Sequence, residues 1–265
     1  MRILILIFSG FVFQIQCIQA QLEKFKFQPE KIKSGEVYFY KKSNQDGSHL
    51  HWVATYIADE SSMESLKWME GNIGTTLVSA KMDWETFSVQ EFEGGRITPE
   101  GQKVIGARLK QEGDKGKYEI QIGNINETVQ LDLFPWHSYD FDFTSLNMTW
   151  RHLIDVKADF TFDIADIVLI DNQPRFRNKG TVDIEYEKEE VRNGVDCLRY
   201  RIDGPGLEHR GGTIWVSKQD QLFIEYLIDI PDERGYDDMK FQFDRIEQMT
   251  TSEWEGFKNM VASGR

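Results

Sequence analysis

A pair of histidines is the first place where the sequence could do chemistry. His49 and His51 alternate, so in a strand their imidazoles share one face and could bind a metal if a third ligand came from elsewhere. No residue at a diagnostic spacing supplies that ligand. Because Leu50 and Trp52 occupy the other face, the two histidines are typical of the solvent side of an amphipathic strand. The sequence therefore predicts no metal site and no cofactor.

A second histidine lies close to carboxylates. His137 precedes Asp140 and Asp142, and a histidine beside a carboxylate can carry out acid–base work. No nucleophile or substrate signature accompanies them, and Ser138 or Asp140 also stands where a helix cap is expected. We predict no catalytic residue. A hydrolase of an envelope or extracellular polymer, acting through His137 and these carboxylates, stays open as an alternative.

Two further motifs favour structural roles. The glycines of residues 204–206 and 211–212 could cradle a phosphate if a helix followed them, but an alternating, strand-like run follows. They therefore predict sharp bends between strands. Cys197 is the one cysteine after residue 20, so no disulfide can form within that part of the chain, and its place in a hairpin predicts a buried thiol.

The N-terminus has the layout of a secretory signal peptide. Arg2 precedes an apolar run at residues 3–13, and the stretch ends at Ala20. This run is shorter than the roughly 20 residues that span a bilayer, and no later run is comparable. We expect cleavage near Ala20 and a periplasmic or extracellular protein that is not embedded in a membrane. Residues 21–265 are expected to form a single domain.

The charge of the chain argues against nucleic-acid binding. The 31 basic and 44 acidic residues give a formal net charge of −13, and removing Arg2 with the signal peptide makes it −14. Such a surface repels nucleic-acid phosphates and anionic lipid headgroups. We therefore expect no nucleic-acid partner.

Short alternating runs separated by turn residues dominate the chain and predict a meandering antiparallel sheet. Strands are expected near residues 36–41, 49–58, 65–70, 75–82, 86–92, 103–110, 117–122, 128–133, 160–170, 181–187, 195–202 and 222–230. One amphipathic helix is expected within residues 140–155, and the capping box Thr250–Glu253 predicts a C-terminal helix. The fold class is mainly β (α+β): a curved antiparallel sheet or half-barrel covered by one or two helices.

The apolar faces of the predicted helix and of the strand at residues 222–230 suggest where a ligand could bind. Alternation places the strand's aliphatic and aromatic side chains on one face, opposite Glu225. The expected lining residues are Phe143, Leu146, Trp150, Leu222, Ile224, Tyr226 and Ile228. The same residues could equally fill a dry core.

Two segments carry a resemblance to a known family. WHSYDFDFTSLNMTWRHL at residues 136–153 and RIDGPGLEHRGGTIWVSKQDQLFIEYLIDIPDERGYDDMKFQF at residues 201–243 resemble a family of exported bacterial proteins with no assigned chemistry. That family is similar at fold level to the LolA-like lipoprotein carriers. The resemblance implies an incomplete barrel closed by helices, with an apolar cavity that holds acyl chains in the carriers.

Three functions follow from these expectations. The leading hypothesis is an exported, non-catalytic protein that binds a lipid or another apolar small molecule between sheet and helices. The alternatives are the hydrolase described above and a scaffold or protein-interaction module that uses a sheet edge or the acidic surface.

Overall fold

The computed structural model describes residues 20–113, 115–132, 134–139, 143–231 and 235–264. The predicted signal peptide, apart from Ala20, lies outside these ranges, and so do Asp140 and Asp142. Within the described ranges, no helix is both long and apolar enough to cross a membrane.

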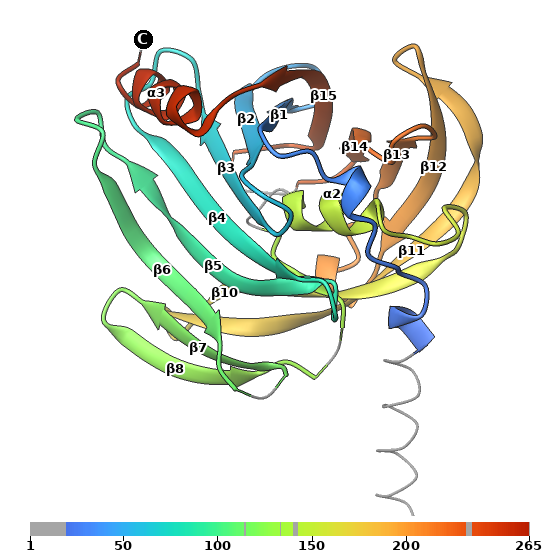
Figure 1. Cartoon of the computed structure of the whole chain (residues 1–265), viewed down its shortest axis with the longest axis horizontal. Coiled ribbons are helices and arrows are strands. Elements are labelled where there is room, and N and C mark those ends of the chain that lie inside the picture. The colour runs from blue at the N-terminus through green and yellow to red at the C-terminus, as the bar shows by residue number, and fades with distance from the viewer. Residues whose placement is uncertain (1–19, 114, 133, 140–142, 232–234, 265) are drawn as a thin grey trace, which may run out of the picture.

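The described residues form one large, mainly antiparallel sheet (Figure 1). Its strands are β1 (Glu36–Ser43), β2 (His51–Ile57), β3 (Ser62–Trp68), β4 (Thr75–Asp83), β5 (Ser88–Ile97), β6 (Lys103–Gln111), β7 (Lys117–Ile122), β8 (Ile125–Gln130), β9 (Trp136–His137), β10 (Phe160–Ile170), β11 (Gln173–Arg192), β12 (Val195–Asp203), β13 (Thr213–Ser217), β14 (Phe223–Ile228) and β15 (Met239–Gln248). The helices are η1 (Pro29–Lys31), α2 (Thr144–Trp150), η2 (Pro205–Leu207) and α3 (Thr251–Ala262).

The strand order explains how the sheet is assembled. It runs β8-β7-β6-β5-β4-β3-β2-β1-β15-β14-β13-β12-β11-β10-β9, so nearly all neighbours are consecutive in sequence. The first strand pairs with the last, β1 with β15, and this pairing joins the two halves of the chain. Only β9 pairs in parallel with its neighbour among the described strands, through two residue pairs with β10. The mainly β, antiparallel expectation is confirmed.

The sheet curves until its two ends approach each other (Figure 1). Register shifts interrupt the β1–β15, β4–β5 and β5–β6 ladders, and such bulges bend a sheet. At one end of the sheet, the Trp136 amide of β9 donates to Ser88 Oγ of β5 over 3.0 Å. Near the other, the Phe176 amide of β11 donates to Glu127 Oε1 of β8 over 2.8 Å. Among the described residues, hydrogen bonds to these two side chains bridge the gap between the sheet ends.

Helix α2 lies inside the curve of the sheet (Figure 1). All seven of its residues are buried, and it packs in the main hydrophobic cluster. The helix is shorter than expected at both ends. Phe143, at its N-cap, has a left-handed backbone with φ 54°. After Trp150 the amides of His152 and Leu153 donate to the carbonyl oxygens three residues before them, which ends the α-helical pattern. Ser138 does not cap it: the Ser138 hydroxyl donates instead to Asp166 Oδ1 over 2.6 Å. The capping role predicted for Ser138 is therefore wrong.

Helix α3 begins where the sequence predicts. The Glu253 amide donates to Thr250 Oγ1 over 3.3 Å, and the Thr250 amide donates to Glu253 Oε2 over 2.7 Å, which completes the capping box. Its Trp254 and Val261 pack in a second cluster with residues of β1 to β5, among them Leu66. The side chains of that second cluster alternate with those facing α2, so α3 packs on the opposite face of the sheet.

Candidate functional site

The predicted ligand-lining residues of α2 and β14 form a filled core. Phe143, Leu146, Trp150, Leu222, Tyr226 and Ile228 all belong to the main buried cluster. The Phe143 and Tyr226 rings lie 5.7 Å apart, and the Trp150 and Phe223 rings 5.3 Å apart. The structure therefore brings these six residues together as the sequence suggests.

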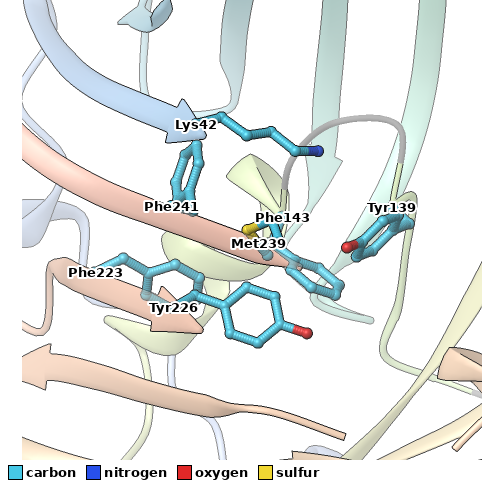
Figure 2. Close-up of a pocket in the computed structure, with 7 residues that line it drawn as sticks. All are labelled: Lys42, Tyr139, Phe143, Phe223, Tyr226, Met239 and Phe241. Carbon is cyan, nitrogen blue, oxygen red and sulfur yellow. The ribbon is translucent and has the colours of Figure 1, made fainter. Parts of the chain in front are cut away.

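The space left between them is small (Figure 2). It has a volume of about 10 Å³ and is lined by Lys42, Tyr139, Phe143, Phe223, Tyr226, Met239 and Phe241. A volume of that size accommodates about one water molecule. In this conformation, the interior between α2 and β14 has no room for an acyl chain.

Ile224 lies on the other face of the sheet. Trp215 pairs with Glu225 and Val216 with Phe223, so Ile224 is an extra residue at a β-bulge. It packs with Cys197 and Trp215 in a separate small cluster. Grouping it with Tyr226 was wrong because a period of two holds only along an uninterrupted ladder.

A much larger space lies over the concave face of β3 to β7 and extends past the ends of these strands, where Trp68, Ile73 and Pro99 also line it. We call it the concave groove; its volume is about 1020 Å³. The strand register explains its floor: Val78 pairs with Gly94, Gly94 with Ala107, and Ala107 with Ile122. These paired positions face the same side as the main core but carry small or aliphatic side chains. The groove exists where this row leaves volume unfilled.

Larger apolar side chains bound the floor. A Cβ at Gly94 would lie 3.2 Å from the Phe92 ring, so that ring leans over Gly94 and covers this part of the floor. In the row beyond it, Ala80 and Leu109 are buried. Ile167 of β10 also lines the groove, and β10 crosses below β5 towards β7 in Figure 1. The groove is therefore walled by two distant parts of the chain.

The rim of the groove is cationic. Lys67 pairs with Thr76, and Thr76 pairs with Arg96, so these residues form the row two positions along from the Val78–Gly94 floor. Arg96 is exposed and has no ion pair among the described residues. Glu100, in the turn after β5, is the sole carboxylate among the described lining residues. A polar, positively charged edge thus borders an apolar floor.

His137, the histidine of the hydrolase alternative, is not accessible to solvent. His137 is fully buried, and its Nδ1 lies 3.0 Å from Ser145 Oγ. Burial lowers its pKa to about 3, so the imidazole is neutral near pH 7. His152 is also buried, and burial, with Lys31 and Arg151 nearby, lowers its pKa to about 3. Both rings pack as core residues.

The surroundings of His49, His51 and Cys197 also indicate structural roles. β2 begins at His51, whose Nδ1 lies 2.6 Å from the Tyr236 hydroxyl, while His49 precedes the strand with φ 54°. Among the described residues no group of three or more His, Cys, Asp or Glu could hold a metal. Cys197 is buried, and burial raises its pKa to about 11.

The sequence analysis missed the concave groove, although a signal for it exists. Gly94 and Gly95 stand together in one strand, and Gly106 and Ala107 in the next. Gly95 is required locally because a Cβ there would lie 2.2 Å from the Val104 carbonyl oxygen. Small residues at paired positions of neighbouring strands indicate missing side-chain volume, but only once the register is known.

Comparisons with known proteins find similar structures at low identity. No family model matches the chain. No curated protein matches it either. A protein of Bacteroides fragilis, described as exported with a YmcC-like fold, has 10% identity and a TM-score of 0.31, covering 85% of this chain and 100% of its own. A DUF1329 family protein of Desulfovibrio piger has 11% identity and a TM-score of 0.33, with coverages of 89% and 94%.

A third structure comes from Vibrio parahaemolyticus. It is described as an outer membrane lipoprotein-sorting protein domain, and it has 9% identity and a TM-score of 0.22, covering 95% of this chain and 100% of its own. Of the three structures, one is described as an exported protein and one as a lipoprotein-sorting domain. At these identities and TM-scores no activity or ligand transfers from them to this chain.

Proposed function

We propose that this protein is an exported, non-catalytic carrier or receptor that binds a hydrophobic, lipid-like molecule in the concave groove. The observation that supports this most is the groove itself, about 1020 Å³ in volume with an apolar floor at Val78, Ala107 and Ile122. Small-molecule sites typically occupy a few hundred to about 1000 Å³ and are mostly apolar with a few polar groups. The signal-peptide pattern at residues 1–20 supports export of residues 21–265 as one domain.

The filled interior restricts where such a ligand can lie. The residues around α2 leave about 10 Å³, whereas the groove opens to solvent. Phe143, Leu146, Trp150, Leu222, Tyr226 and Ile228 would contact a ligand only if α2 moved away from β14. In this proposal the groove is the binding site and the α2 core is the support that holds the sheet in its curve.

Filling the groove tests the proposal. Ala107→Trp places an indole over the floor, and Gln121→Trp adds the same side chain at an exposed β7 position on the opposite face. Both variants and the parent chain are titrated with a fluorescent fatty-acyl probe. Native mass spectrometry of gently purified protein looks for co-purified lipid.

Probe binding by the parent and by Gln121→Trp, with loss in Ala107→Trp, is the expected result. Circular dichroism and thermal unfolding establish that Ala107→Trp is folded. If the parent binds no acyl probe and carries no lipid, the proposed function is wrong.

A further inference from the structure

We propose that the concave groove selects an amphiphile with an anionic head, bound between Lys67 and Arg96, whose aliphatic chain lies over Ala107 and against the Phe92 ring. This inference rests on the proposed function and specifies its ligand class. The head is a carboxylate or a phosphate group. The observation that supports this inference is the sequence of side chains along the strands, in which a cationic row is followed by an apolar row.

The register defines that order. On β5, Arg96, Gly94 and Phe92 are alternate residues and point to the same face. Going from Arg96 to Phe92 therefore covers about 14 Å at roughly 3.4 Å per residue. A ligand lying along this line meets first the Arg96 guanidinium and then the Phe92 ring, which leans over Gly94.

Lys67 and Arg96 can reach the same anion. They lie on β3 and β5, on either side of Thr76 in β4, so their backbones are about 10 Å apart. Both side chains are long, and a guanidinium forms paired hydrogen bonds with carboxylate and phosphate oxygens. The Thr76 side chain, exposed between them, offers a hydroxyl to the same head group.

The local charge opposes the charge of the whole protein. The chain has a formal net charge of −13, yet the described lining residues of the groove include Lys67 and Arg96 against one carboxylate, Glu100. The acidic surface elsewhere disfavours anionic amphiphiles over most of the molecule. A cationic rim restricted to the groove therefore directs such a ligand to this place.

Chain-matched probes separate the head from the tail. The full chain without residues 1–20 is titrated by calorimetry with dodecanoate, dodecanol, lysophosphatidylglycerol and lysophosphatidylcholine, each below its aggregation threshold. The same titrations are run on Arg96→Gln, on Lys67→Gln and on Lys81→Gln. Lys81 is a matched control, because it is an exposed lysine of β4 on the opposite face.

We expect dodecanoate, lysophosphatidylglycerol or both to bind more tightly than dodecanol and lysophosphatidylcholine. Binding of dodecanoate alone identifies a fatty-acid carboxylate, and binding of lysophosphatidylglycerol alone identifies a lipid phosphate. Arg96→Gln and Lys67→Gln should each weaken anion binding about threefold to fivefold, whereas Lys81→Gln changes it less than about twofold.

Two results would overturn the inference in distinguishable ways. If the neutral and anionic probes bind equally and Arg96→Gln has no effect, the groove binds lipid-like molecules without selecting the head, and the proposed function stands. If none of the four probes binds, the proposed function itself fails.

Discussion

Removing the indole of Trp150 tests whether α2 supports the curved sheet. Trp150 is fully buried, and its ring meets those of Phe160, Tyr200 and Phe223 edge to face at 4.9, 4.8 and 5.3 Å. These partners lie on β10, β12 and β14, so one side chain connects three strands to the helix. Trp150→Ala leaves a cavity at this junction.

The expected cost is large for a single substitution. An aromatic side chain buries 150–250 Å², and about 25 cal/mol per Å² gives roughly 4–6 kcal/mol of lost transfer free energy. Measured Phe and Trp truncations to Ala cost about 3–5 kcal/mol. Taking about 4 kcal/mol, the midpoint of thermal unfolding should fall by roughly 8–16 °C for a domain of this size.

The chain without residues 1–20 is unfolded with urea and by heating, and circular dichroism monitors both transitions. Ile154→Ala is the matched control because Ile154 lies just after α2 and is 62% exposed. That control should lose less than about 0.5 kcal/mol. If Trp150→Ala unfolds at the same urea concentration as Ile154→Ala, α2 does not support the sheet in the way described.

Three further predictions concern buried and bridging groups. Burial lowers the pKa of His137 and His152 to about 3, so below about pH 6.5 the unfolded chain binds more protons than the folded protein. The free energy of unfolding should therefore fall as the pH drops from about 6.5 towards 3. An NMR titration that gives either imidazole a pKa near 6.5 would contradict this. Glu127→Gln should lower the free energy of unfolding by about 1 kcal/mol, because the carboxylate accepts a hydrogen bond from the Phe176 amide and pairs with Arg177 over 3.1 Å. The same substitution should speed hydrogen exchange at the Phe176 amide. Unchanged exchange there would show that Glu127 does not hold the two sheet ends together. Burial raises the pKa of Cys197 to about 11, so the folded protein should resist maleimide near pH 7 and react in urea, and rapid labelling without denaturant would refute its burial.

Local sequence signals were sufficient for several elements. The alternating runs predict the antiparallel strands, and the capping box at Thr250 predicts the start of α3. Asn193-Gly194 predicts the β11–β12 turn, where both residues have positive φ angles of 52° and 78°. Each of these features depends on interactions between residues close together in the chain.

The features that could not be predicted depend on register or on distant segments. The bulge at Ile224 turns that side chain to the opposite face, and nothing in the alternation marks it. The start of α2 at Thr144 follows from the left-handed backbone of Phe143, which the apolar spacing does not reveal. The concave groove needs Gly94 of β5 beside Ala107 of β6 and Ile167 of β10 across from them, a juxtaposition created by the curved sheet.

Photo-crosslinking tests the concave groove most directly. A fatty acid carrying a diazirine near the end of its chain is irradiated with the protein, and the labelled residues are mapped by peptide mass spectrometry. Binding in the groove predicts labels on β4 to β7, at or beside Val78, Phe92, Ala107 and Ile122. Labels concentrated on α2 and β14, or on the face that carries α3, would contradict binding in the groove.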